Sequence, residues 1–189
     1  MVQGVGERIM KFTPTSIPDV ILIEPHVFED SRGFFMETFQ AERFRENGID
    51  ANFVQDSQSG SYDGYVRGLH YQIKHPQGKL VRVVFGEIFD VCVDLRLSSH
   101  TFGKWVAIEL SSRNKKQLWI PPGFAHGFCV RSDMAEVIYK ETDYYDPEFE
   151  RILLWNDSDV GVKWPYGAVI SAKDIYGVTL KNADIFEDM

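Results

Sequence analysis

Residues 67–96 read RGLHYQIKHPQGKLVRVVFGEIFDVCVDLR, and their short apolar runs predict buried β-strands. His70 precedes Lys79 on what we interpret as a pair of neighbouring strands. A base and a cation held on rigid strands are what proton abstraction next to a carbonyl group requires. A second signal, PPGFAH at residues 121–126, follows at about the spacing expected for the second half of a small β-barrel. Together the two stretches predict a barrel whose mouth is fitted for acid–base chemistry.

Short apolar runs recur along the rest of the chain. They predict strands at residues 20–23, 34–39, 52–55, 65–71, 80–85, 88–95, 105–110, 117–120, 128–130 and 136–140. A helix is expected at residues 40–47, because an Asn-Gly signal ends it there. Closely spaced turn signals are typical of a β-sandwich or closed barrel. The 189 residues suit one domain, 1–189, with residues 1–11 as a flexible N-terminal extension.

The net charge of the chain limits its partners. A formal charge of −8 and a pI of about 5.1 argue against non-specific nucleic-acid binding, which needs a cationic face. An anionic small ligand would need a local basic cluster, and Arg32, Arg67, Lys79 and Arg82 could supply one. We therefore expect a small-molecule ligand and no nucleic acid.

The hydrophobic pattern of the chain indicates the cellular compartment of the protein. The apolar runs are far shorter than a membrane span, and the N-terminus lacks the pattern of a secretory signal, so we expect a cytoplasmic protein that does not enter a membrane. Cys92 and Cys129 both lie in apolar runs. We interpret both as buried free thiols.

A metal site is considered first, because small barrels with a Pro-x-Gly-x-x-His element often bind a metal through a His-x-His pair, a Glu and a further His. Here the first pair becomes His70-Tyr71-Gln72, and Lys79 stands where the carboxylate ligand is expected. A protonated amine repels a divalent cation. We therefore expect neither a metal nor another cofactor.

Proton transfer without a metal is the remaining chemistry. A histidine such as His70 titrates near neutral pH, and Lys79 could stabilise the enolate that proton removal creates. Tyr139 could return a proton from the opposite face, although a strand tyrosine is more often part of the core. Taken singly, His70 would be a core or loop histidine, Lys79 an ordinary strand lysine, and His126 a turn histidine bonded to backbone. Their joint placement with Arg67 favours the functional interpretation.

The chain resembles the dTDP-4-dehydrorhamnose 3,5-epimerase family, the dTDP-sugar epimerase branch of the cupin folds. The resemblance runs from about Phe12 to Asp174. Its motifs are DSRGFFMETF (30–39), FVQDSQS (53–59), RGLHYQ (67–72), QGKLVRVVFGEIFDVCVDLR (77–96), TFGKWVAIEL (101–110), QLWIPPGFAHGF (117–128), YKETDYYDP (139–147) and ISAKD (170–174). The resemblance implies a mainly β fold, a cupin-type jelly-roll β-barrel with a few short peripheral helices.

The resemblance also implies residue roles. His70 matches the catalytic base, and Asp174 matches the carboxylate that orients it. Lys79 matches the lysine that stabilises the enolate at C4, and Tyr139 the acid on the other face. The expected reaction inverts C3 and C5 of dTDP-4-dehydro-6-deoxy-D-glucose, giving dTDP-4-dehydro-L-rhamnose.

Substrate contacts and assembly are implied as well. The residues that match substrate contacts are Arg67, His126, Tyr145 and Gln55, together with Arg32, Phe35 and Glu37, which in the family reach the nucleotide partly across the interface of a strand-exchanged homodimer. Ser57 stands where an asparagine is usual, and Gly60 where a larger or basic residue is common. These two departures flank the substrate site and bear on the choice of sugar and nucleotide.

Three rival functions remain at this point. The first is an epimerase acting at C3 or C5 only, or on another dTDP- or CDP-linked 4-keto sugar. The second is a ketoisomerase on the same scaffold, which usually lacks an equivalent of Tyr139. The third is a non-enzymatic sugar- or metal-binding cupin, which an intact His-x-His-plus-Glu set would favour.

Overall fold

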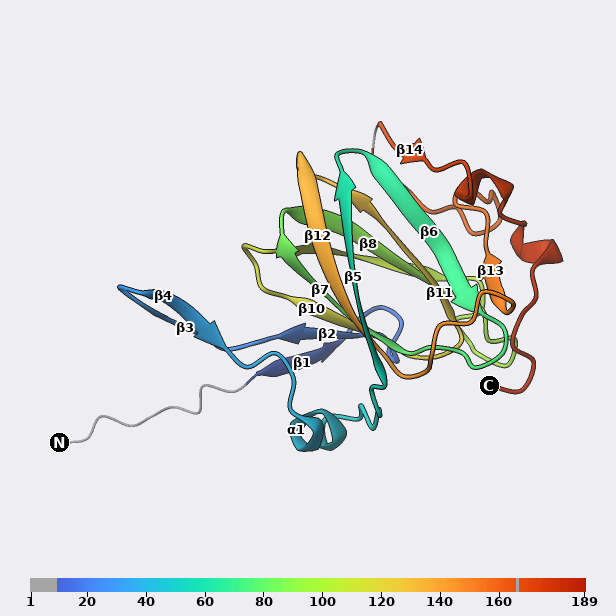
Figure 1. The fold of residues 1–189 in the computed structure, drawn as a ribbon. Helices are drawn as coiled ribbons and strands as arrows, with labels where there is room; N and C mark the ends of the chain where they lie inside the picture. The colour runs from blue at the N-terminus through green and yellow to red at the C-terminus, as the bar shows by residue number, and fades with distance from the viewer. Residues whose placement is uncertain (1–9, 166) are drawn as a thin grey trace.

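The computed structural model describes residues 10–165 and 167–189. Two β-sheets face each other as a jelly-roll barrel, and the helices are short and peripheral (Figure 1). The mainly β cupin-type fold is therefore confirmed. Met10 is buried and Lys11 begins the first strand, so the predicted flexible extension is wrong for these two residues. Its residues 1–9 lie outside the described residues.

The first sheet has six antiparallel strands. In spatial order they are β1 (Lys11–Pro14), β2 (Ile21–Glu24), β10 (Gln117–Ile120), β7 (Lys79–Phe85), β12 (Met134–Glu141) and β5 (Gln55–Tyr62). Side chains alternate between its two faces, as the strand period of two requires. Val81, Val83 and Val137 consequently point into the barrel core, whereas Leu80 belongs to a separate cluster outside it.

The second sheet completes the barrel. Its strands in spatial order are β13 (Glu150–Ile152), β6 (Tyr65–Gln72), β11 (Phe124–Val130), β8 (Glu87–Asp94) and β9 (Trp105–Ser111), and β14 (Val169–Ile170) pairs with β6 in parallel. Ile88, Cys92 and Phe128 meet the valines of the first sheet in one core. Cys92 and Cys129 are both buried and free, which confirms their interpretation.

The segments outside the barrel cover its faces. The helix α1 (Ala41–Glu46) packs Phe44 against Leu80 and Trp119 of the first sheet, and Gln40 caps its N-terminus by accepting from the Arg43 backbone N–H at 2.6 Å. The C-terminal segment, with the 3₁₀ turns η1 (Asp174–Tyr176) and η2 (Leu180–Asn182), lies against the second sheet (Figure 1). Among the described residues, no helix has the length and apolar character needed to cross a membrane.

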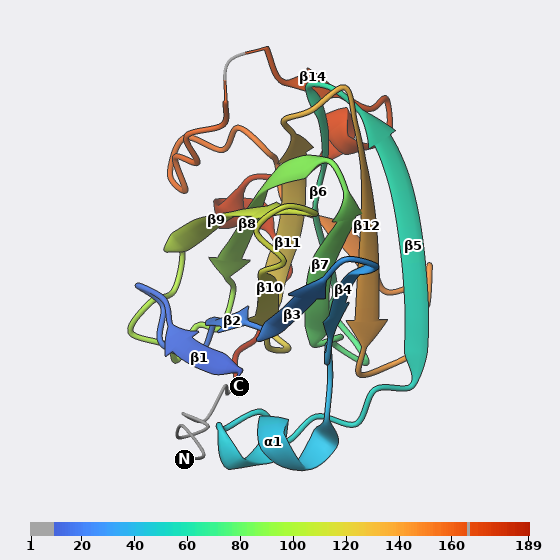
Figure 2. The ribbon, with the colours of Figure 1, turned by 90° about the vertical axis from the view of Figure 1, so that its left-hand side faces the viewer.

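A hairpin of β3 (Val27–Asp30) and β4 (Gly33–Met36) projects away from the barrel. Figure 2 shows it in front of the outer face of the first sheet. Phe28, Phe34 and Phe35 on this hairpin are all exposed, and Phe35 is 72% exposed. These exposed aromatic side chains form an apolar surface that the rest of the chain leaves uncovered within the described residues.

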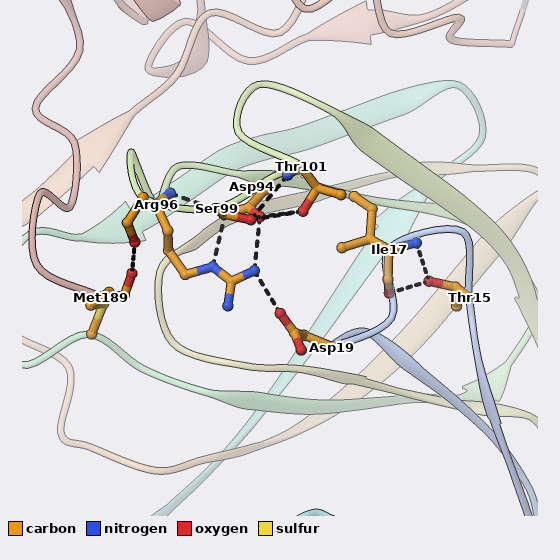
Figure 3. A network of polar contacts seen from close by, with 9 residues as sticks. Thr15, Ile17, Asp19, Asp94, Arg96, Ser99, Thr101 and Met189 are labelled. Atoms are coloured by element: carbon orange, nitrogen blue, oxygen red, sulfur yellow. Dashed lines mark hydrogen bonds and ion pairs between the residues drawn. The ribbon is translucent and has the colours of Figure 1, made fainter.

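A buried carboxylate at the end of β8 holds the loop that follows this strand and, through Arg96, the N-terminal loop (Figure 3). Asp94, with no exposed surface, accepts from Arg96 Nε and Nη2 at 2.9 and 2.8 Å, and from the hydroxyls of Ser99 and Thr101, each at 2.6 Å. Burial by itself would raise the pKa of Asp94, but these hydrogen bonds outweigh it and hold the pKa below its usual value. Arg96 Nη2 also reaches Asp19 Oδ2 at 2.8 Å and so fixes the N-terminal loop.

Candidate active site

A cavity of about 420 Å³ opens between the two sheets. Residues of both sheets and of the loops after β12 and β14 line it: Ser57, Gln58, Ser59, Arg67, His70, Tyr71, Gln72, Gln77, Lys79, His126, Gly127, Phe128, Tyr139, Glu141, Tyr145, Glu150, Ser171, Lys173 and Asp174. The structure therefore brings together all four residues predicted to be catalytic, and three of those predicted to bind substrate.

The histidine–carboxylate pair spans β6 and η1. His70 Nε2 lies 2.7 Å from Asp174 Oδ1, and the Gly68 backbone N–H donates to Asp174 Oδ2 at 3.3 Å. Burial of Asp174 would raise its pKa, but the hydrogen bond and charge of His70 outweigh this and lower it. Asp174 is thus a partner whose ionised form is favoured, and its hydrogen bond to Nε2 fixes the ring of His70.

The backbone next to His70 depends on a glycine. Gly68 has φ +127°, and a Cβ at this position would lie 2.5 Å from Gly127 Cα on β11. Only glycine permits both this conformation and this close approach of two strands. The Gly68 N–H donates to Asp174, the partner of His70 at the cavity wall.

Lys79 and Tyr139 lie on the opposite sheet. Burial lowers the pKa of Lys79, and the negative charges of Glu141, Glu150 and Asp90 partly offset this effect. Tyr139 Oη is 3.0 Å from Ser59 Oγ, and burial raises the pKa of this phenol above its ordinary value. Tyr139 is therefore a neutral hydroxyl that faces the cavity, across from His70.

Strand β5 carries a row of polar side chains into the cavity. Glu141 Oε2 accepts from Gln55 Nε2 at 2.7 Å and from Ser57 Oγ at 2.8 Å. Gln55 Oε1 accepts from the Tyr145 backbone N–H at 3.0 Å. Gln55, a predicted ligand contact, therefore lies directly behind Tyr145 and does not itself line the cavity.

A second histidine–carboxylate pair is buried deeper. His126 Nε2 lies 2.9 Å from Asp90 Oδ2, and both side chains have little or no exposed surface. The alternative of a turn histidine bonded to backbone is wrong, because His126 is within β11 and its partner is a side chain. The ring of His126 meets that of Tyr139 edge-on, with the centroids 6.3 Å apart.

The cavity mouth carries exposed charges and an aromatic ring. Tyr145 is 49% exposed and its hydroxyl donates to Glu150 Oε2 at 3.3 Å. Lys173 Nζ contacts the same oxygen at 2.5 Å. Arg67 is exposed and lines the cavity as well, so two cationic side chains stand at the entrance.

Four of the predicted substrate contacts do not line this cavity: Gln55, which lies just behind its wall, and three residues of the hairpin region. Arg32 pairs with Asp30 at 2.6 Å at the hairpin tip, Phe35 is exposed on β4, and Glu37 accepts from Arg43 Nη1 at 2.6 Å. None of them lines the cavity of its own chain. They belong to the projecting hairpin and to the segment after it (Figure 1).

Several residues at the site were not found by sequence reasoning. Ser59, Glu141, Glu150 and Lys173 line the cavity, and the fully buried Asp90 lies behind its wall, bonded to His126. The one periodic signal at residues 55–62 is the recurrence of serine at every second position, Ser57, Ser59 and Ser61. No group of three or more His, Cys, Asp or Glu side chains within residues 10–165 and 167–189 is arranged to hold a metal ion.

A jelly-roll barrel with a histidine–carboxylate pair on one sheet, and a lysine and a tyrosine on the facing sheet, defines a site of the cupin type whose groups suit acid–base chemistry. The dTDP-4-dehydrorhamnose 3,5-epimerase family model matches residues 14–182. The dTDP-4-dehydrorhamnose 3,5-epimerase of Neisseria gonorrhoeae is 55% identical over 177 residues, covering 93% of this chain and 54% of that protein. The enzyme of the same description from Pseudomonas aeruginosa is 53% identical over 180 residues, covering 94% and 99%.

The solved structures agree with the sequence comparisons. The crystal structure of dTDP-6-deoxy-D-glucose-3,5-epimerase from Legionella pneumophila in complex with dTDP-4-keto-L-rhamnose superposes with a TM-score of 0.92 at 47% identity, covering 96% of this chain and all of that chain. This chain belongs to the dTDP-4-dehydrorhamnose 3,5-epimerase family. It spans about half the length of the Neisseria relative and nearly all of the Pseudomonas one.

Proposed function

We propose that this protein inverts C3 and C5 of dTDP-4-dehydro-6-deoxy-D-glucose to give dTDP-4-dehydro-L-rhamnose. The observation that carries the proposal is the pairing of His70 with Asp174 on one wall of the cavity and the placement of Tyr139 on the other. Inversion needs a base on one face of the sugar and an acid on the opposite face, and the two sheets supply them separately.

Proton removal is the first half of each inversion. The 4-keto group acidifies the neighbouring C–H bonds at C3 and C5. His70 takes the proton, and the carboxylate of Asp174 stabilises the imidazolium that forms. The electron pair moves to the C4 oxygen, where the ammonium group of Lys79 stabilises the enolate.

Proton return completes the inversion. The enolate collapses to the ketone and its carbon takes the phenolic proton of Tyr139 on the face opposite His70. The ring proton of His70 and the phenolate of Tyr139 then exchange with water, which restores both groups. The same sequence at the second carbon gives the doubly inverted sugar.

The charged cavity mouth suits a sugar nucleotide. Arg67 and Lys173 offer cations to the diphosphate, and the exposed ring of Tyr145 offers a surface to the nucleotide. His126 is held by Asp90 beside Tyr139 and contacts the sugar. Gln55 acts through the Tyr145 backbone, which it fixes.

A homodimer with strand exchange would place the hairpin of one copy beside the cavity of the other. Arg32, Phe35 and Glu37 lie outside the cavity of their own chain, and the exposed phenylalanines of the hairpin need a partner surface. A second copy that accepts the hairpin would receive these residues beside its nucleotide. The two free, buried cysteines suit a reducing compartment, and we place the enzyme in the cytoplasm.

The experiment that tests the function uses the whole chain and dTDP-4-keto-6-deoxyglucose in D₂O. Deuterium at both C3 and C5 of the product, with inverted stereochemistry at both, is the expected result. Deuterium at one carbon only would replace the proposal with a single-centre epimerase. No deuterium at either carbon would reject both.

A further inference from the structure

Of the two residues directly opposite Lys79 on the neighbouring strands, one is apolar and the other is acidic. On one side, β10 places the apolar Ile120 directly opposite Lys79. On the other side, β12 places Glu141 there, and Glu141 is in turn opposite Gln55 of β5. Directly opposed residues of antiparallel strands bring their Cβ atoms within about 4.5–5.5 Å of each other. Lys79 therefore has one acidic cross-strand neighbour.

Glu141 is held in place by neutral donors. Its Oε2 atom accepts from both Gln55 and Ser57, whereas Oε1 has no hydrogen-bond partner among the described residues. Glu141 is also buried, with 7% of its surface exposed. The side chain of Lys79 likewise takes part in no hydrogen bond or ion pair within the described part of the chain, although its backbone is paired in the sheet. The buried carboxylate of Glu141 has no cation bonded to it, and its cross-strand neighbour is the half-buried amine of Lys79, which has no bonded anion.

We infer that Glu141 is a positioning residue, which keeps Lys79 charged in the cavity and so sets the upper pH limit of turnover, an inference that rests on the proposed function. Lys79 can stabilise an enolate only as an ammonium ion. Burial favours the neutral amine, and the negative charge of its cross-strand neighbour Glu141 opposes this. Ser57 and Gln55 contribute by fixing Glu141 rather than by contacting the reacting atoms.

Other charged groups face Lys79 from the packed elements. Glu141 gives the largest of the opposing effects on its pKa, and Glu150 on β13 and Asp90 on β8 give smaller ones. His70 and Tyr139 share the cavity wall. Glu109, the titratable residue of β9, is exposed to solvent. A change at Glu141 should thus dominate the titration of Lys79.

The test removes the charge of Glu141 and keeps its shape. In Glu141→Gln, the amide oxygen can still accept from Ser57 and Gln55. We expect the alkaline limb of the pH profile for kcat/KM to move down by about 1–3 pH units. The Cε resonance of Lys79 in ¹³C-lysine-labelled protein, assigned with Lys79→Arg, should titrate lower by the same amount. Glu141→Asp, which keeps the charge, should restore most of both shifts.

The chain offers a matched control on the same two strands. Glu136 of β12 accepts from Gln58 Nε2 of β5 at 2.9 Å, as Glu141 does from Gln55, but this pair is exposed. Glu136→Gln should leave both titrations unchanged. A Lys79 titration that is the same in Glu141→Gln as in the unaltered protein would overturn the inference, as would an equal shift in Glu136→Gln.

The measurements separate this inference from the proposed function. Should the unaltered protein exchange no deuterium, the function fails, and the resonance of Lys79 still decides whether Glu141 holds its charge. Folding is checked by circular dichroism. If Glu141→Gln does not fold, Glu141→Thr, which suits a strand and keeps an acceptor for Ser57, gives the same comparison.

Discussion

His70 and Asp174 are 104 residues apart in the sequence, yet the Nε2 and Oδ1 atoms of their side chains are 2.7 Å apart. The parallel pairing of β14 with the start of β6 brings the segment of Asp174 to this position. Ser171 Oγ then accepts from the backbone N–H of Asp174 at 3.1 Å and fixes its turn. The orientation of the base therefore depends on the C-terminal segment.

Loss of the base should nearly abolish turnover. We expect His70→Asn to lower deuterium exchange at both carbons by about 10²–10⁴-fold, the usual contribution of a positioned general base. Asp174→Asn should reduce exchange at both carbons together, because it acts through His70. Exchange at unaltered rates in His70→Asn, measured by NMR in D₂O, would remove His70 from its role.

Loss of the acid should separate exchange from inversion. In Tyr139→Phe, His70 and Lys79 remain, so the enolate still forms, but no proton arrives from the opposite face. We expect deuterium in recovered substrate with little inverted product. Tyr65→Phe, at an exposed position on β6, is the control and should behave as the unaltered enzyme. Product formation at the normal rate in Tyr139→Phe would contradict the assignment.

The Asp94 network should make a pH-dependent contribution to stability. Asp94→Asn leaves Arg96 without its buried partner, and we expect the free energy of unfolding at pH 7 to fall by about 3–5 kcal/mol. The folded-state pKa of Asp94 is lowered, so this contribution is fully present above the unfolded value of about 3.9. It is lost as the pH falls through the lower folded-state pKa.

Urea unfolding at several pH values checks this expectation. The difference between the two proteins should shrink as the pH is lowered below about 4. Asp19→Asn is the matched control, because Asp19 is the exposed partner of the same arginine. Its effect should stay below about 1 kcal/mol. A constant difference across the pH range would show that the charge of Asp94 is not what stabilises the loop.

The hairpin should control the oligomeric state. Phe35 is the most exposed phenylalanine of β3 and β4, and Phe35→Ser removes its apolar surface without touching the barrel. We expect self-association to weaken by about 30-fold or more, as for a residue that contributes 2 kcal/mol to an interface. Sedimentation velocity measures this, with Tyr62→Ser as an exposed aromatic control at the end of β5. An unchanged dimer would place the interface elsewhere.

Strand β5 shows where apolar periodicity fails to predict a strand. The predicted strand at residues 52–55 is wrong in placement, since β5 begins at Gln55 and runs to Tyr62. Ser57 and Ser59 point into the cavity and bond Glu141 and Tyr139, so no apolar alternation announces the strand. A strand that lines a polar site lacks the hydrophobic signal that identifies a strand lining a core.

The sequence by itself determined the strands that build the core and a helix predicted at residues 40–47, which the structure places at Ala41–Glu46. It could do so because apolar period and end signals are local properties of the chain. Its motifs also marked His70, Lys79, Tyr139 and Asp174. Only the tertiary structure decided that Asp90 holds His126, that Glu141 stands opposite Lys79, and that Arg32, Phe35 and Glu37 lie outside their own cavity. The physical reason is that such contacts arise from strand register and chain crossing, which bring together residues far apart in the sequence.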